Sequence, residues 1–187
     1  CSDEIHCDLL LDEGATHVPL AAISPEITDK TITLMAPSKT FNLPGFGCSF
    51  AIISNPELRR RYKKACAGIV PDPPAMGFAL AEAAYRHGEP WRQRLLHYLR
   101  ANRDLALSRL GAIPALFPFP VSATYLLWID ARELGVENPQ QFFEEAGVGL
   151  SDGADFGSPG FLRLNLGCTR ALLEQALDRM EQAVGAR

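Results

Sequence analysis

Four ionisable residues interrupt apolar stretches at positions where they could do chemistry. Asp3 and His6 lie in CSDEIHCDLL, Lys39 follows an apolar run in APSKTFNLPG, and Arg163 lies inside the apolar run FLRLNLG. A lysine next to a buried strand must lose its charge or find a partner, and a neutral lysine amine is both a nucleophile and a base. Taken alone, each residue also has a structural explanation: a loop lysine, a capping aspartate, a core histidine or an arginine in a salt bridge.

Composition limits the classes of protein to which these residues can belong. With 187 residues, 47% hydrophobic and 21% charged, the chain has the make-up of a globular protein with a sizeable core. The formal net charge of −4 argues against a general nucleic-acid surface. The basic run RRRYKK at 59–64 is interpreted as a solvated helix face, with phosphate or nucleic-acid binding as the alternative.

Apolar stretches and cysteines limit the location of the protein. No apolar stretch reaches the roughly 20 residues of a membrane span, and the start of the chain has no signal-peptide pattern. The five cysteines are odd in number and show no CxxC spacing. They therefore predict free thiols in a reducing cytoplasm rather than a disulfide frame or a metal site.

The elements that must position these residues alternate between strand and helix patterns. Three short apolar runs have the pattern of buried strands: 4–11, 31–36 and 47–54. Three helical patterns follow: 55–68, 73–88 and 89–111. The first has Asn55 as its expected N-cap and Pro56 at its first position. The third carries an apolar stripe over about six turns, formed by Trp91, Leu95, Leu99, Leu105 and Leu110.

Three prolines in IPALFPFP, at 113–120, break regular structure and mark a domain boundary near residue 112. Strand and helix patterns then alternate again over 124–131, 138–147, 160–167 and 169–187. The sequence therefore predicts an α/β protein in three parts. These are part of an α/β domain over 1–88, a long interdomain helix over 89–111 and a small α+β domain over 112–187.

Four stretches together, SDEIHCDL, APSKTFNLPG, TYLLWID and FLRLNLGCTR, resemble a known family in the same order and over nearly the whole chain. This is the class I/II aminotransferase family of fold-type I pyridoxal-phosphate (PLP) enzymes, and the branch is that of the cystathionine β-lyases named for MalY and PatB. The resemblance implies the C-terminal part of a PLP-dependent transferase fold: a partial large-domain sheet, a linking helix and the whole small domain. It also implies a fragment that starts in the middle of the large-domain sheet.

The resemblance assigns a role to each of the ionisable residues, with PLP as cofactor. Lys39 would form the Schiff base with the cofactor aldehyde, which requires an amine whose pKa is lowered by burial and nearby cations, and would act as the general base. Asp3 would accept a hydrogen bond from the pyridine N–H, and Ser38 and His6 would also bind the cofactor, His6 near its phenolic oxygen. Arg163 would bind the substrate α-carboxylate with its planar fork.

Two positions depart from the pattern of many aminotransferases in the family. Gly47 stands eight residues after the lysine, where an arginine commonly binds the cofactor phosphate, and Ala36 stands where a serine is common. The β-lyase-like SKTFN branch tolerates both changes. The phosphate would then depend more on upstream residues, as would stacking on the cofactor ring.

The implied parent is a cytoplasmic, homodimeric enzyme that acts on an amino-acid substrate and has no nucleic-acid or membrane partner. Its expected reaction is carbon–sulfur β-elimination on cystathionine or cysteine-like substrates, and transamination is the alternative. A second alternative is the PLP-binding effector module of a MocR-type transcription regulator. The fragment alone is expected to fold in its C-terminal lobe, to bind the cofactor weakly and to be inactive.

Overall fold

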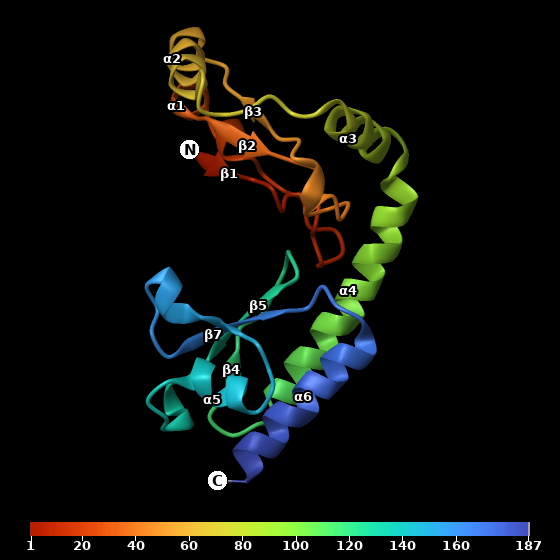
Figure 1. Cartoon of the computed structure of the whole chain (residues 1–187), viewed down its shortest axis with the longest axis vertical. Coiled ribbons are helices and arrows are strands. Elements are labelled where there is room, and N and C mark those ends of the chain that lie inside the picture. Colours follow the sequence, from red (N-terminus) through yellow and green to blue (C-terminus); the bar gives the residue numbers. More distant parts are fainter. Residues whose placement is uncertain (187) are drawn as a thin grey trace. The chain divides into compact units, whose positions relative to one another are not determined.

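The computed structural model describes residues 1–186. The chain divides into two compact units, Cys1–Leu95 and a second unit that begins at Leu96. Each unit has its own sheet (Figure 1). The sheet of the first unit has three strands, and that of the second has four. Among the described residues, no helix is long and apolar enough to cross a membrane.

The sheet of the first unit has the strand order β1-β2-β3. β1 (Ser2–Asp3) runs parallel to β2 (Thr33–Met35), and β2 pairs antiparallel with β3 (Phe50–Ile52). The strands expected within 31–36 and 47–54 are therefore confirmed in shorter form. Two or three residues per strand are enough to fix the direction of β1 and β2, and this direction sets where the following turns lie.

The strand expected over 4–11 is wrong, because the backbone turns directly after β1. The Cys7 amide donates to the Glu4 carbonyl, and the Leu9 amide donates to the His6 carbonyl, both at 3.0 Å. Leu9 and Leu11 are fully buried. Their burial explains the apolar pattern, but turns rather than a ladder satisfy the backbone.

The first unit has three complete helices and the start of a fourth. They are α1 (Pro25–Lys30), α2 (Pro56–Cys66), α3 (Ala75–His87) and α4 (Glu89–Leu110). Short 3-10 turns lie at η1 (Leu20–Ala22) and η2 (Pro44–Phe46). The last three helices agree with the sequence patterns, whereas α1 was not predicted.

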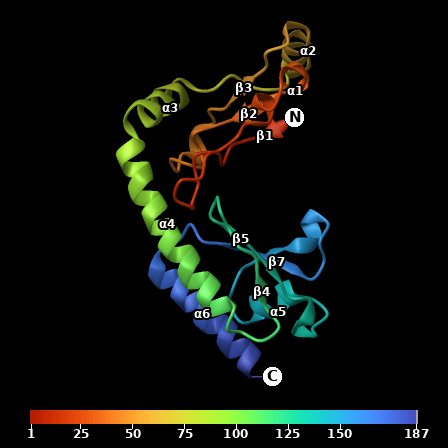
Figure 2. The ribbon, with the colours of Figure 1, turned by 180° about the vertical axis from the view of Figure 1, so that it is seen from behind.

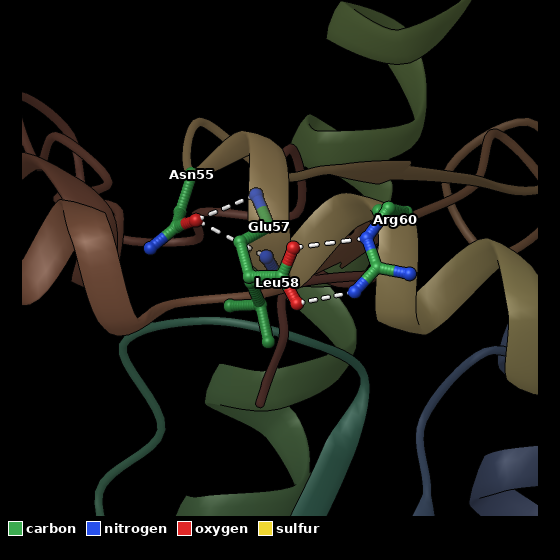
Figure 3. A network of polar contacts seen from close by, with 4 residues as sticks. All are labelled: Asn55, Glu57, Leu58 and Arg60. Carbon is green, nitrogen blue, oxygen red and sulfur yellow. Dashed lines mark hydrogen bonds and ion pairs between the residues drawn. The ribbon is translucent and has the colours of Figure 1, made fainter.

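The start of α2 illustrates the capping expected for Asn55. Its Oδ1 accepts the amides of Glu57 at 2.9 Å and of Leu58 at 3.1 Å, and the Glu57 carboxylate binds the Arg60 guanidinium through two hydrogen bonds (Figure 3). α2 has no buried residue. The basic run at 59–64 accordingly lies on a mostly exposed helix.

The sheet of the second unit is antiparallel throughout, with the strand order β4-β5-β7-β6. Its strands are β4 (Phe117–Pro118), β5 (Leu126–Asp130), β6 (Ser151–Asp152) and β7 (Phe161–Asn165). β5 and β7 lie inside the predicted runs. β4 falls in the proline-rich stretch, and β6 was not predicted; each has two residues, too few to form a sequence pattern.

The core of the second unit lies between the sheet and its helices. α5 (Pro139–Glu145) and α6 (Arg170–Gly185) are the expected helices, with 3-10 turns at η3 (Arg132–Leu134) and η4 (Gly153–Phe156). α4 and α6 lie side by side in both views (Figures 1 and 2). One cluster of buried side chains joins α4, α6, α5 and the inner face of the sheet, including Leu110, Leu177, Phe143, Leu127 and Leu162.

The stripe expected on α4 is confirmed at Leu99 and Leu110 and differs at its other positions. The buried residues of this helix are Leu96, Leu99, Asn102, Ala106 and Leu110. Trp91 is 39% exposed, and Leu95 and Leu105 are half-buried. The buried residues keep a spacing of three and four residues. The prediction passed over Asn102 because this core position is polar.

Candidate active site

Asp3 and Lys39 lie at the same edge of the sheet of the first unit. Asp3 is the last residue of β1, and Lys39 lies in the turn that follows β2. β1 and β2 are parallel, and Asp3 pairs with Leu34. The carboxyl ends of parallel strands meet at one edge of a sheet, which is where ligands bind in α/β proteins.

Asp3 offers a carboxylate that is exposed and only partly engaged. Its Oδ1 accepts the Ile5 amide at 3.2 Å, and its Oδ2 has no partner among residues 1–186. The turn after β1 places His6 three residues further on, half-buried, with its carbonyl bonded to the Leu9 amide. This edge therefore presents an open anionic acceptor with an imidazole in the following turn.

The turn after β2 is built by backbone hydrogen bonds around Lys39. The Phe41 amide donates to the Pro37 carbonyl and the Leu43 amide to the Ser38 carbonyl, both at 2.9 Å. Asn42 closes this turn in the left-handed region, with φ of 54°, which asparagine tolerates better than most residues. The side chain of Lys39 projects from a backbone that its neighbours hold in place.

Lys39 is exposed, so residues 1–186 do not by themselves provide the burial expected around this lysine. Its amine has no hydrogen-bond or ion-pair partner among the described residues. Its neighbour Thr40 is buried, and the Thr40 hydroxyl has no hydrogen-bond partner in the described part of the chain. Buried hydroxyls are rarely left in this state, so Thr40 is an unusual residue of this turn.

Sequence reasoning missed a clamp formed by Glu4, the residue after Asp3. Glu4 is buried; its Oε2 lies 2.7 Å from His17 Nε2 and its Oε1 accepts the Leu20 amide at 3.0 Å. Although burial acts to raise its pKa, hydrogen bonds from His17 and Leu20 outweigh it, and the pKa of Glu4 is lowered. The loop between β1 and α1 is thereby tied to the strand that carries Asp3.

A second tie holds the turn after β1 to the start of α4. Arg92 Nη1 donates to the Asp8 carbonyl at 2.8 Å, and the same guanidinium binds both carboxylate oxygens of Glu89 at 2.7 Å. In this turn, burial and, to a smaller extent, the charges of Asp8 and Glu4 together raise the pKa of Cys7 to about 11. The Cys7 thiol is therefore protonated at neutral pH and is a poor nucleophile.

Arg163 lies on β7 in the second unit, on the face opposite the core. Its neighbours Leu162 and Leu164 are buried, and across the sheet it pairs with Trp128 on β5 and with Ser151 on β6. Arg163 Nη2 donates to Ser151 Oγ at 3.2 Å. The salt bridge that would have explained this arginine structurally does not occur among residues 1–186.

The guanidinium of Arg163 is covered instead by an aromatic ring. Its Cζ lies 4.4 Å from the ring centroid of Phe156, which follows the short strand β6. Phe156 packs edge-on against Trp128 at 5.9 Å, and Trp128 stacks on Phe161 at the same centroid distance. No sequence pattern pointed to Phe156, because its contact with Arg163 depends on the path of the intervening loop.

Within the described range 1–186, no group of three or more His, Cys, Asp or Glu side chains is placed to hold a metal ion. None of the five cysteines is in a disulfide. The chemistry available is that of an amine, a carboxylate and an imidazole at one sheet edge, and of an uncompensated guanidinium on a second sheet.

A mixed α/β unit with a lysine and an aspartate at the ends of parallel strands, joined through a long helix to a small α+β unit, is typical of the PLP-dependent transferases. The chain matches the family "Aminotransferase class I and II" over residues 1–180, and it belongs to this family. The fold class predicted from the sequence is thereby confirmed.

Individual relatives agree with the expected branch. Cystathionine beta-lyase PatB of Bacillus subtilis (strain 168) is 34% identical over 98% of this chain and 49% of PatB. The crystal structure of OvoB superposes with a TM-score of 0.98 and 48% identity, covering 100% of this chain and 49% of OvoB. Cystalysin from Treponema denticola, whose crystal structure contains a pyridoxal 5'-phosphate cofactor, has a TM-score of 0.92 and 31% identity over 99% of this chain and 48% of cystalysin. The chain spans about half the length of these relatives.

Proposed function

We propose that the whole protein is a PLP-dependent carbon–sulfur β-lyase that acts on cystathionine or a related cysteine-like amino acid. The observation that carries this proposal is the position of Asp3 and Lys39, which follow two parallel strands to the same edge of the sheet. The similarity to the lyase PatB supports the reaction, and the similarity to cystalysin supports the cofactor.

The residues at this edge fit PLP by the chemistry of their donors and acceptors. Lys39 offers an exposed amine without a partner in the described chain, as needed to bond an aldehyde. Asp3 keeps Oδ2 open to accept the N–H of a pyridinium ring, while Oδ1 is fixed by the Ile5 amide. Ser38 and His6 lie in the turns that carry these two residues, and we assign them to cofactor binding.

When bound, PLP supplies a pyridinium ring that takes up the electron pair released at the substrate α-carbon. The Asp3 carboxylate would favour the protonated ring through its negative charge. The Lys39 amine would take the proton from the α-carbon as a general base. Over the whole reaction the Cα–H and Cβ–S bonds break, the sulfur leaves as a thiol, and water converts the remaining enamine into pyruvate and ammonia.

Arg163 would bind the α-carboxylate of the substrate. A guanidinium presents a planar fork that matches a carboxylate with two parallel hydrogen bonds. Arg163 has the necessary free capacity, because its contacts in the described chain are a neutral hydroxyl, Ser151, and a ring, Phe156. An anionic ligand would therefore meet a cation that no carboxylate of residues 1–186 has neutralised.

The assignment of Lys39 is tested by absorbance. In the whole protein loaded with PLP, Lys39→Ala should abolish the near-visible band that borohydride reduction removes, because the covalent bond between amine and aldehyde is lost. Lys30→Ala is the matched control, since Lys30 is an exposed lysine of α1 paired with Glu26. A reducible band that persists in Lys39→Ala would sink the assignment.

The reaction itself is tested by the requirement for an acceptor. A β-lyase given cystathionine should release pyruvate and a free thiol in the absence of any keto acid. Transamination is the second candidate, favoured by the family to which the chain belongs. If turnover requires an acceptor such as 2-oxoglutarate and yields no pyruvate from cystathionine, the protein is an aminotransferase.

We also propose that the whole protein is a cytoplasmic homodimer with no nucleic-acid or membrane partner. The five free cysteines support a reducing compartment. Apolar side chains that are largely exposed in the first unit, such as Ile52 at 52% and Ile69 at 80%, support surfaces covered by further protein. Light scattering on the purified whole protein measures the mass directly, and a monomer at micromolar concentration would contradict the dimer.

A further inference from the structure

We propose that Phe156 is a positioning residue for Arg163, holding the guanidinium in its carboxylate-binding orientation without neutralising it. This inference rests on the proposed function of Arg163. Phe156 is 51% exposed and lies outside the hydrophobic core, so its position needs an explanation other than core packing. Its ring covers the guanidinium with 4.4 Å between Cζ and the ring centroid.

The loop that carries Phe156 is built to a fixed geometry. Asp152 caps the 3-10 turn η4 by accepting the Ala154 amide at 2.9 Å, and the Ser158 amide closes the loop on the Gly153 carbonyl at 2.9 Å. A side chain at Gly153 would collide with the carbonyl oxygens of Ser158 and Phe161, so only glycine lets the loop lie so close to β7. The loop thus fixes the position of the Phe156 ring.

The chemistry of this contact explains why a ring, and not a carboxylate, holds the arginine. An aspartate in the same place would orient the guanidinium but would occupy the donors that a ligand needs. A ring attracts the cation through its π-face and leaves the in-plane N–H groups free. Ser151 adds one neutral hydrogen bond at 3.2 Å, which fixes Nη2 from the neighbouring strand.

The ring of Phe156 is held by a row of aromatic neighbours. Trp128 packs edge-on against Phe156 at 5.9 Å and stacks on Phe161 with an interplanar angle of 16°. The guanidinium of Arg132 covers the other end of this row, 4.7 Å from the centroid of Phe161. Arg132 is already paired with Asp130, so Arg163 is the member of the row that remains open to a carboxylate.

The test separates a positioning effect on Arg163 from a general effect on folding by comparing two substitutions of Phe156 with a matched control. The variants are Phe156→Leu, which removes the π-face, Phe156→Tyr, which retains it, and Arg163→Gln. Phe119→Leu is the control, because Phe119 is similarly exposed at 46% and contacts Phe161 but not Arg163. Each is made in the whole protein loaded with PLP and measured in two ways: KM and kcat for cystathionine, and calorimetric binding of propionate, a carboxylate without an amine.

A cation–π contact at an exposed site is worth about 0.5–1 kcal/mol, so KM and the propionate Kd should rise about 2- to 5-fold in Phe156→Leu, with kcat nearly unchanged. Phe156→Tyr should restore both constants, and Phe119→Leu should leave both unchanged. Unchanged constants in Phe156→Leu, with propionate binding lost in Arg163→Gln, overturn the role of Phe156 alone. Unchanged propionate binding in Arg163→Gln overturns the role of Arg163 as well.

Discussion

Replacement of the buried Asn102 by alanine should strongly destabilise the second unit. Asn102 is fully buried on α4. Its Nδ2 donates to the Leu166 carbonyl at 2.9 Å and to the Cys168 carbonyl at 3.1 Å, while its Oδ1 accepts Arg170 Nε at 2.7 Å. One side chain thus fixes the segment that joins β7, the strand of Arg163, to α6.

The size of the effect follows from these three hydrogen bonds. Each contributes about 0.5–1.5 kcal/mol net, and a buried partner left unsatisfied costs more, so Asn102→Ala should lower the free energy of unfolding by about 2–4 kcal/mol. Asn102→Asp keeps the acceptor for Arg170 but loses both donors to the carbonyls. It should therefore remain destabilised despite its equal size.

The assay is equilibrium urea unfolding of the chain in a Trp91→Phe background, so that fluorescence reports only on Trp128 in the second unit. With a slope of about 2 kcal/mol per molar urea, the midpoint should fall by roughly 1–2 M. Ser108→Ala, at an exposed position of the same helix, is the control. A midpoint of Asn102→Ala equal to that of the control would refute the argument that this amide supports the end of β7.

Two further predictions concern a titrating pair and a glycine. The Arg92 guanidinium and the Gln93 amide hold the pKa of Glu89 at about 2, below its ordinary value of 4.5. The contribution of the Glu89 carboxylate to the stability of the fold should therefore be complete above about pH 4.5 and disappear toward about pH 2. Urea midpoints of wild type and Glu89→Gln should therefore converge as the pH falls, and a difference that is constant with pH would contradict this pairing. Gly153→Ala should destabilise the second unit by several kcal/mol, because the added Cβ meets two carbonyl oxygens. Gly149→Ala is the control, since a Cβ at Gly149 meets no atom within 4 Å. Equal thermal midpoints for the two variants would rule out the close approach of Gly153 to these carbonyl oxygens.

Helices with a local start signal could be predicted from the sequence to within about two residues. Asn55 and Asn138 each precede a proline and cap α2 and α5 as their residue types indicate. The same signal, Ser24 before Pro25, starts α1, yet this helix was missed. It has six residues, and Ile27 is its one large apolar side chain, so no stripe accompanied the cap.

The parts that failed depend on contacts between distant residues. The run 4–11 has the apolar pattern of a strand, and its Leu9 and Leu11 are buried. The turns after Asp3 are instead held by residues distant in the sequence, His17 on Glu4 and Arg92 on the Asp8 carbonyl. Asp3 and Lys39 could be singled out because each lies in a short stretch, SDEIHCDL or APSKTFNLPG, that resembles the family. Phe156 could not, because its contact with Arg163 is a product of loop closure.

The helix α2 is a segment whose order depends almost entirely on its own residues. It buries no side chain; its start is held by the Asn55 cap and the Glu57–Arg60 pair (Figure 3), and Arg59 Nη1 donates to the Ile53 carbonyl at 3.1 Å. Helices of about 12 residues are marginal in water without tertiary packing, so α2 should open at a much lower free energy than α4 or α6. Because trypsin cleaves after arginine and lysine, limited digestion of this chain should begin within the basic run at 59–64, and the second unit should outlast that first cut.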